Sequence, residues 1–389
     1  MGSRILFLNH TAAPGGAELF LLTLAKGLRN RGAVILFQDG PLRLFLEQEK
    51  VPVEIMEADA GISAVSREAG MLRQICAIAG AARLAWQLAA RAKEFDVLFA
   101  NSQKALIVGA LTAFFSGKPL IWYLHDILTA DHFSASNRRM AVIFANQCVD
   151  KVLANSKATL ESFVAAGGRR ELAAVIYNGF EAECYATKSP PARHELRREL
   201  GIGEEPLIGT FSRLAPWKGQ LILLEAIAEI PGVHVLLAGA PLFGEEARYE
   251  AEVKARTERL GIANRVHFLG FRNDVPELLQ AVDIVVHTSI APEPFGRVIV
   301  EGMLAAKPVV ATRAGGACEI IEDNLTGRLV APGDARELAS ALRDLLDNPE
   351  KAEKIARAGQ DTVVRRFSVE RMLTGVVEQV EAVAGAMKK

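Results

Sequence analysis

The feature that most constrains the fold is an alternation of short apolar runs with longer amphipathic segments along all 389 residues. Such runs are typical of buried strands, and strands separated by helices form βαβ units with parallel sheets. The sequence therefore predicts an α/β fold. The expected strands are 4–8, 33–37, 96–100, 119–124, 151–154, 174–177, 207–211, 233–238, 265–269, 283–287, 308–311 and 328–330. The expected helices are 16–30, 67–93, 103–115, 157–166, 218–229, 245–260, 274–281, 296–305 and 334–347.

The chain divides into two halves with the same alternation, and its length suits about two to three domains. Segment 178–206 is polar, contains Ser189-Pro190-Pro191 and lacks a long apolar run, so we place the domain boundary there. We expect a first domain of residues 1–180 with a C-terminal helix at 368–389, and a second domain of residues 181–367. Both are expected to be doubly wound and Rossmann-like, facing each other across a cleft lined by the carboxyl ends of their strands.

Composition excludes several classes of protein. The net charge of −1 gives no bulk field that would attract nucleic acid. The four cysteines form no CxxC pair, which argues against a zinc site or a disulfide framework and indicates a reducing compartment. No apolar run approaches the roughly 18 residues of a membrane-spanning helix, and the first apolar run is expected to be a strand rather than a signal peptide. A cytoplasmic location is therefore expected.

Glu293 and Glu301 flank the start of an expected helix that follows an apolar strand and a Pro-constrained loop. Such a helix N-terminus offers free backbone N–H groups to oxygen-rich ligands, and Gly296 permits close approach of the backbone. The two carboxylates could then engage hydroxyls at different points of one extended ligand. Taken alone, a solvated Glu301 and a capping Glu293 explain the pattern equally well.

Arg213 and Lys218 flank an expected turn between a strand and a helix. A guanidinium and an ammonium that converge there could clamp two phosphates. The turn is not a GxxxxGK[ST] phosphate loop, and two surface cations remain the alternative.

Two weaker signals lie in the first half. Gly16 ends a Gly-Gly turn after the first strand, which suits backbone contact with a diphosphate but is not a GxGxxG dinucleotide motif. His125 follows the strand 119–124, so it is expected at the ligand-binding edge of the first sheet. A structurally hydrogen-bonded histidine is the alternative.

Together these residues resemble the group 1 family of retaining glycosyltransferases with the GT-B fold. The resemblance covers most of the chain, and the second half matches more closely. Arg297, segment 303–307 and Cys318 depart from the family pattern without removing a charged group. Besides the glutamate pair and the Arg213/Lys218 turn, the matching segments are 236–239, 266–271, Leu278-Leu279, Asp283, 308–312, Gly315-Gly316, 319–321 and Thr326-Gly327.

The resemblance implies a hexosyl transfer from a nucleoside-diphosphate sugar, with a UDP-sugar favoured. Arg213 and Lys218 would stabilise the leaving diphosphate, Glu301 would bind the ribose, and His125 would contact the sugar. The remaining implied contacts are Glu293 and the backbone N–H groups of Phe295, Gly296 and Arg297 to the sugar, Gly16 to the diphosphate or acceptor, and Arg272 and Val275 to the base.

The resemblance also implies a glycan or lipid-linked acceptor in polysaccharide or glycoconjugate biosynthesis. No Asp-x-Asp motif occurs, so we expect no divalent metal and no other cofactor. Retention by front-face transfer is our working hypothesis. Two other functions stay open: a nucleotide-sugar epimerase, for which Asp126 and Asp131 are the only nearby acid–base candidates, and a non-catalytic nucleotide-sugar binding protein.

The expected helix 67–93 carries Arg67, Arg73, Arg83, Arg91 and Lys93, with Ile75, Ile78, Ala82 and Trp86 interpreted as its other side. A basic amphipathic helix with tryptophan could rest on the inner face of an anionic membrane. A helix that packs on the first sheet with solvated charges is the alternative.

Overall fold

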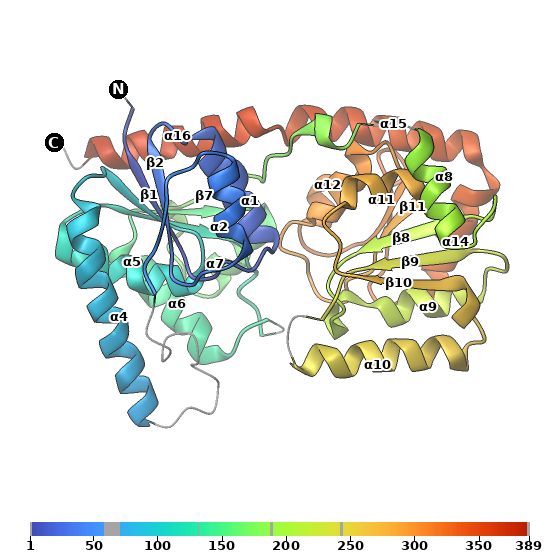
Figure 1. The fold of residues 1–389 in the computed structure, drawn as a ribbon, viewed down its shortest axis with the longest axis horizontal. Helices are drawn as coiled ribbons and strands as arrows, with labels where there is room; N and C mark the ends of the chain where they lie inside the picture. Colours follow the sequence, from blue (N-terminus) through green and yellow to red (C-terminus); the bar gives the residue numbers. More distant parts are fainter. Residues whose placement is uncertain (1, 58–70, 131, 187–189, 242–243, 387–389) are drawn as a thin grey trace. The chain divides into compact units, whose positions relative to one another are not determined.

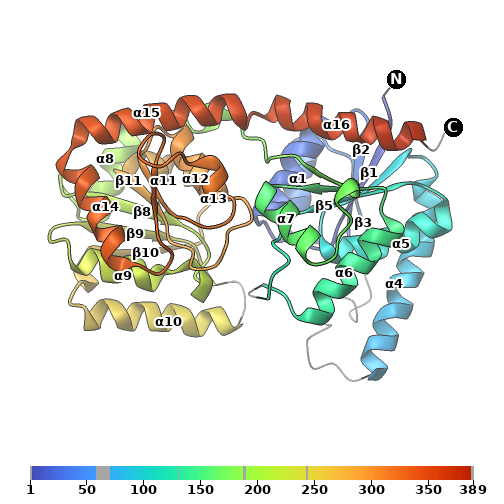
Figure 2. The ribbon, with the colours of Figure 1, turned by 180° about the vertical axis from the view of Figure 1, so that it is seen from behind.

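The chain forms two compact units, which Figures 1 and 2 show from opposite sides. A computed structural model describes residues 2–57, 71–130, 132–186, 190–241 and 244–386. Met1–Gly179 and Val369–Lys389 make up the first unit, and Phe180–Ser368 makes up the second.

The first unit contains a parallel sheet in the order β3-β2-β1-β4-β5-β6-β7. The chain builds outward from β1 on one side and then continues from β4 on the other, so the strand order reverses between β1 and β4. Ligands bind at such a reversal point in open α/β sheets. The strands are β1 (Ile5–Asn9), β2 (Gly32–Leu36), β3 (Val53–Ile55), β4 (Val97–Ala100), β5 (Leu120–Leu124), β6 (Lys151–Ala154) and β7 (Ala173–Val175).

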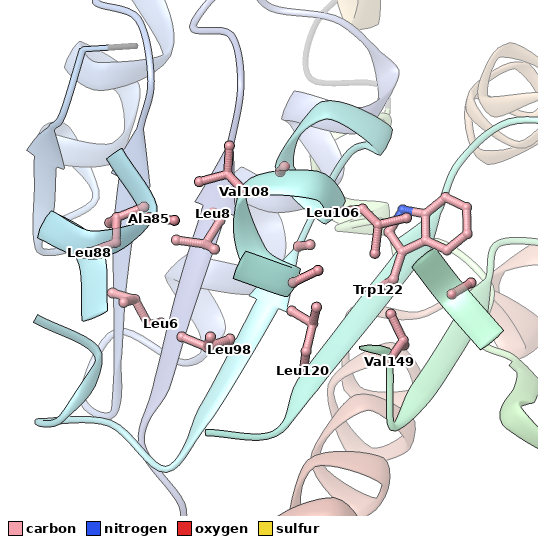
Figure 3. Close-up of a cluster of buried hydrophobic side chains, with 14 of the residues drawn as sticks. Leu6, Leu8, Ala85, Leu88, Leu98, Leu106, Val108, Leu120, Trp122 and Val149 are labelled. Atoms are coloured by element: carbon pink, nitrogen blue, oxygen red, sulfur yellow. The ribbon is translucent and has the colours of Figure 1, made fainter. Parts of the chain in front are cut away.

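Alternate residues of these strands pack into two separate cores. Leu6 and Leu8 face the core beneath α4, α5 and α6, which Figure 3 shows, whereas Ile5 and Phe7 face the core beneath α1, α2 and α16. Burial on both faces explains why the strands read as continuous apolar runs. The helices are α1 (Gly16–Gly27), α2 (Pro41–Gln48), α4 (Met71–Ala92), α5 (Gln103–Ser116), α6 (Ala135–Cys148), α7 (Lys157–Ala165) and α16 (Val369–Ala386).

The second unit contains a parallel sheet in the order β10-β9-β8-β11-β12-β13, which reverses between β8 and β11. Its strands are β8 (Leu207–Phe211), β9 (His234–Ala238), β10 (Val266–Gly270), β11 (Ile284–His287), β12 (Val309–Thr312) and β13 (Arg328–Val330). Its helices are α8 (Pro190–Glu199), α9 (Gln220–Ala228), α10 (Gly244–Arg259), α11 (Val275–Ala281), α12 (Arg297–Leu304), α13 (Ala317–Ile320), α14 (Ala335–Asp347) and α15 (Pro349–Arg366).

The composition of segment 178–206 suggested only a domain boundary, but the segment also contains a helix. Its Pro190–Glu199 part is helix α8, and Arg197 there is buried and ion-paired with Asp283 at 3.3 Å. The same guanidinium donates to the carbonyl oxygens of Gly203 and Ala281. Most of this polar segment therefore belongs to the second unit, because one buried arginine supplies the anchoring that an apolar run would otherwise provide.

Candidate active site

The loops after β8 and β11 meet at the reversal point of the second sheet. Thr288 Oγ1 donates to the Lys218 carbonyl oxygen at 2.9 Å, and the Ile290 N–H donates to the Trp217 carbonyl oxygen at 2.8 Å. Gly219 has a φ of 69°, and a Cβ there would lie 2.1 Å from the Thr288 carbonyl oxygen. This turn therefore requires glycine, and its hydrogen bonds bring the Arg213/Lys218 segment to the glutamate-bearing loop.

A cluster of polar side chains holds one oxygen of Glu293. The Lys218 ammonium donates to Glu293 Oε2 at 2.7 Å, and Ser289 Oγ donates to the same oxygen at 3.0 Å. His287 Nε2 lies 3.1 Å from it. Since an ionised carboxylate only accepts hydrogen bonds, His287 carries its proton on Nε2. All three contacts fall on Oε2, which fixes the direction in which the carboxylate points.

The electrostatics of Glu293 follow from this cluster. Burial raises the pKa of the carboxyl, but the Lys218 charge and the bond from His287 outweigh it and hold the pKa well below its ordinary value of 4.5. The Lys218 and Glu293 side chains are 12% and 13% exposed. The site is therefore a largely buried ion pair at neutral pH.

Gly315 lies against the backbone of Glu293. It has a φ of 60°, and a Cβ there would lie 2.2 Å from the Glu293 carbonyl oxygen. The next residue, Gly316, donates its N–H to the same oxygen at 2.7 Å. The Gly315-Gly316 pair thus positions Glu293 from the loop after β12.

Arg213 has a carboxylate partner of its own. Its Nη1 lies 3.1 Å from Glu246 Oε1, near the start of α10, and the Glu246 side chain is 9% exposed. The two cations expected to converge on a diphosphate are therefore each paired with a different glutamate, Lys218 with Glu293 and Arg213 with Glu246.

Glu301 is not the solvated helix residue of the alternative interpretation. It is buried on α12, and Arg297 Nη2 lies 3.1 Å from its Oε1. The Arg297 guanidinium also lies over the Phe180 ring, 4.6 Å from its centroid. Burial raises the pKa of Tyr185, as do the Glu301 charge and a hydrogen bond to it. Arg297 and Tyr185 therefore both orient the Glu301 carboxylate.

The residues expected around Glu301 differ in whether their backbone or their side chain is available to a ligand. Gly296 precedes α12 with a φ of 97°, and Arg297 is the first residue of that helix. The Phe295 ring is buried between Phe180 and Phe367, so only its backbone can serve a ligand.

The two residues expected beside the base lie at the end of β10. Arg272 Nε donates to Asp274 Oδ1 at 2.7 Å, and Val275 is the first residue of α11. In the sheet, β9 separates β10 from β8, so these two residues follow a different strand from the one that leads to Lys218.

In the first unit, Gly16 begins α1 after an extended Gly15. His125 follows β5 and is partly buried, and its Nε2 lies 2.9 Å from Asn101 Oδ1. Asp126 is exposed, whereas Asp131 lies outside the described residues.

The chain matches two family profiles that together span both units. Residues 14–183 match the family described as Glycosyltransferase Family 4, and residues 192–362 match Glycosyl transferases group 1. The crystal structure of Anabaena HepE in complex with UDP and glucose is 44% identical, with a TM-score of 0.89 over 98% of this chain and 100% of that one. The chain belongs to the group 1 glycosyltransferases.

Curated relatives of this glycosyltransferase match over shorter stretches. The lipopolysaccharide core biosynthesis glycosyltransferase LpsE of Rhizobium meliloti is 35% identical over 43% of this chain and 47% of its own length. The D-inositol 3-phosphate glycosyltransferase of Mycobacterium marinum is 35% identical over 44% of this chain and 36% of its own length. The chain thus spans about half or less of these relatives. Their differing names leave the acceptor open.

Family membership confirms the GT-B fold and the enzyme class, so the epimerase and the non-catalytic binding protein are set aside. Sequence reasoning missed several side chains that contact the expected site residues. They are His287 and Ser289 beside Glu293, Glu246 beside Arg213, Tyr185 beside Glu301 and Asn101 beside His125. His287 and Asn101 were open to prediction, because both are polar residues at the carboxyl ends of central strands. No local pattern marks Glu246, whose partner Arg213 lies 33 residues earlier in the sequence.

Proposed function

We propose that this glycosyltransferase moves a hexosyl unit from a UDP-sugar to a glycan or lipid-linked acceptor. The observation that carries the proposal is the buried Lys218–Glu293 pair at the reversal point of the second sheet, next to the start of α12. Support for uridine comes from HepE, which was solved with UDP and glucose and matches this chain over both units. A place in polysaccharide or glycoconjugate biosynthesis is part of the proposal.

The second unit binds the donor in this proposal. Lys218 and Arg213 stabilise the charge that develops on the leaving diphosphate, the kind of electrostatic effect that is usually the largest in catalysis. To do so, Arg213 exchanges its bond with Glu246 for one with phosphate. Glu293 binds sugar hydroxyls through the oxygen that Lys218 does not hold, and Glu301 binds the ribose.

The other proposed contacts are supplementary. The backbone at Phe295, Gly296 and Arg297 binds the sugar, and Arg272 and Val275 lie beside the base. The first unit binds the acceptor and contributes His125 to the sugar and Gly16 to the diphosphate or acceptor.

Metal independence follows from this assignment. Two cations of the protein take the place of the divalent ion that other nucleotide-sugar enzymes hold through paired aspartates. We expect full transfer in excess chelator. Loss of transfer that added Mg²⁺ restores would contradict this part of the proposal.

Retention by front-face transfer is proposed from the family alone, with the diphosphate taking the proton of the acceptor hydroxyl. A bond forms between the acceptor oxygen and the anomeric carbon on the face from which the diphosphate departs. Product anomer assignment by NMR tests retention. A covalent glycosyl-enzyme adduct detected by mass spectrometry would replace front-face transfer with a double displacement.

A peripheral contact with the inner face of an anionic membrane is also proposed, on a different surface from the one expected. The interpretation of helix α4 was wrong for Trp86: it is 69% exposed, on the same side as the exposed Arg83, while Leu84, Ala85 and Leu88 are buried. Arg67 lies outside the described residues, and the side chains of Arg73, Ile75 and Ile78 are not described.

The proposed membrane surface is the outer side of α4, α5 and α6. These helices contain three arginines, one lysine and two arginines respectively, with no aspartate or glutamate. Exposed Trp86, Phe114, Phe115, Met140 and Ile143 lie on them. Cationic helices with exposed aromatic residues suit an anionic lipid surface. No helix among the described residues is long and apolar enough to cross a membrane.

Vesicle sedimentation tests this surface. We expect binding to vesicles containing phosphatidylserine and not to phosphatidylcholine alone. Phe114→Ser should weaken binding about tenfold, because partial burial of a phenyl ring contributes about 1–2 kcal/mol. Leu325→Ser, at a 48% exposed position of the second unit, is the matched control. If the protein shows no preference for anionic lipid, the proposed membrane contact is wrong and a soluble acceptor is favoured.

Thermal-shift measurements with UDP, GDP, ADP and their sugars test the donor. A ligand that binds only the folded protein raises its stability by mass action, by about 2.7 kcal/mol at a hundredfold excess over Kd. We expect UDP and UDP-sugars to raise the melting temperature most. A larger rise in melting temperature with GDP would indicate a GDP-sugar donor instead. No rise with any nucleotide would overturn the proposal.

A further inference from the structure

Three neighbouring strands of the first sheet end in side chains that form one hydrogen-bonded chain. Asn9 is the last residue of β1, Asn101 follows β4, and His125 follows β5. These strands are adjacent at the reversal point. Asn9 and Asn101 are completely buried, and Glu18 at the start of α1 is 6% exposed.

The bonds run in one direction from His125 to Glu18. His125 Nε2 lies 2.9 Å from Asn101 Oδ1, and Asn101 Nδ2 donates to Asn9 Oδ1 at 3.1 Å. Asn9 Nδ2 in turn lies 3.3 Å from Glu18 Oε1.

Two backbone carbonyls settle which way each amide points. Asn101 Nδ2 also donates to the Ala17 carbonyl oxygen at 3.1 Å, and Asn9 Nδ2 donates to the Thr11 carbonyl oxygen at 2.7 Å. A carbonyl oxygen cannot donate, so the nitrogen of each amide must face it and the oxygen must face the other way. Asn101 Oδ1 is therefore an acceptor, and the His125 nitrogen that it faces must carry the proton.

The His125 ring is held from its other sides as well. Its centroid lies 4.6 Å from that of Tyr123 and 5.1 Å from that of Phe20. Asn155 Nδ2 donates to the His125 backbone carbonyl at 3.0 Å, which fixes the main chain but not the ring. The aromatic contacts limit rotation of the ring, and the contact with Asn101 Oδ1 requires a proton on Nε2.

We propose that Asn101, supported by Asn9, is a positioning residue that holds neutral His125 as the Nε2–H tautomer. Nδ1 is then the nitrogen that accepts hydrogen bonds, so a sugar hydroxyl that contacts His125 through Nδ1 donates to the ring and does not accept from it. The tautomer is a property of the first unit alone. Its role in transfer rests on the proposed function of His125.

Nitrogen NMR of the histidine-labelled full-length protein reads the tautomer directly. The spectra are recorded at pH 8. His125→Gln identifies the signals of this residue. We expect a protonated-type shift at Nε2 and an unprotonated-type shift at Nδ1. The opposite assignment, or an equal mixture of tautomers, would overturn the proposal, and the unsubstituted protein suffices for this test.

Asn101→Leu tests the cause, with Asn155→Leu as the matched control. Both replace a buried asparagine that follows a central strand and bonds to His125. We expect Asn101→Leu to shift His125 toward a mixture of tautomers and Asn155→Leu to leave it unchanged. An unchanged tautomer in folded Asn101→Leu would show that another contact selects it.

Kinetics separate this inference from the proposed function. Asn101→Leu should lower kcat/KM about tenfold while UDP, which lacks the sugar, binds with unchanged Kd. In a His125→Gln background, Asn101→Leu should have no further effect on transfer, because both substitutions act through one ring. If His125→Gln leaves transfer intact, the proposed sugar contact fails while the tautomer result stands. An effect of Asn101→Leu that persists without His125 would overturn its positioning role.

Discussion

Each of the two units has a histidine and a glutamate next to the point where its strand order reverses. His125 and the buried Glu18 belong to the first unit, and His287 and the largely buried Glu293 belong to the second. The two carboxyls nevertheless have pKa values displaced in opposite directions. Burial raises the pKa of Glu18, the Asp126 charge raises it further, and the three hydrogen bonds that oppose them come from the neutral Asn9 amide and the backbone at Glu18 and Gly15. Burial acts on Glu293 too, but the Lys218 charge overrides it.

The difference shows how one fold supports two kinds of chemistry. A single lysine in the loop after β8 converts a buried glutamate from a group that resists ionisation into one half of an ion pair. We assign stabilisation of developing charge to the second unit, where cations are present. The first unit, whose polar centre is built from asparagines, is suited to directing hydrogen bonds rather than to neutralising charge.

The largest expected effect follows from removing the lysine. Lys218→Met should lower kcat/KM for transfer about a hundredfold to a thousandfold, the usual cost of losing one preorganised group that stabilises transition-state charge. Initial rates with UDP-sugar measure it. Lys254→Met, at an exposed lysine paired with Glu250 in the same unit, is the control and should be silent. Similar kcat/KM values for the two variants would contradict the proposal that Lys218 of the second unit stabilises the developing charge.

Glu293→Gln examines the same pair through stability. At pH 7 the variant should be about 2 kcal/mol less stable, because a hydrogen bond to a charged group contributes about 1.5–3 kcal/mol. The pKa of Glu293 is lowered by folding, so its contribution is complete above 4.5 and is lost as the pH falls further. Urea unfolding from pH 7 to pH 3 should therefore show the two proteins converging. A constant gap would mean that shape rather than charge holds the loop.

Much of the fold could be predicted because parallel strands buried on both faces read as short apolar runs. Elements without such a run were missed: the short edge strand β3 is only partly buried, and α6 and α15 lie between recognisable strands or beyond them. The buried anchor Arg197 made α8 look like a linker, since its mean hydropathy is that of a surface segment.

The sequence predicted which residues belong to the site better than it predicted which of them contact one another. Strand-end position pointed to His125, and the loop–helix pattern pointed to Glu293 and Glu301. The sequence could not show that Lys218 contacts Glu293, 75 residues later, or that Arg213 contacts Glu246. Such pairings depend on which loops the sheet order brings together, and they decide the charge of each group.

A smaller effect is expected from Arg297, which contacts Glu301 in the second unit. Arg297→Leu removes the bond to Glu301 and the contact with Phe180. We expect KM for the donor to rise about fivefold with a smaller change in kcat, because the proposed ribose contact of Glu301 acts on binding and the bond that orients Glu301 contributes about 1 kcal/mol. Arg297→Lys keeps the charge but not the planar guanidinium group, so KM for the donor should rise only about twofold. Competition among UDP-sugars would then show whether this position also selects the sugar; an unchanged KM in both variants would exclude it from the donor site.

The smallest expected effect is at Glu18, and it has the opposite sign to that at Glu293. Folding raises the pKa of Glu18, so its contribution to stability is complete below 4.5 and is lost as the pH rises through the folded value. Glu18→Gln removes this loss and keeps an oxygen that accepts from Asn9. The variant should therefore gain stability relative to the unsubstituted protein between pH 4.5 and pH 8, as measured by urea unfolding. Glu378→Gln, at an exposed position of α16 in the same unit, controls for the general loss of one carboxylate. If Glu18→Gln instead loses stability as the pH rises, a cation must reach Glu18 in solution, and the two centres would differ in geometry rather than in charge.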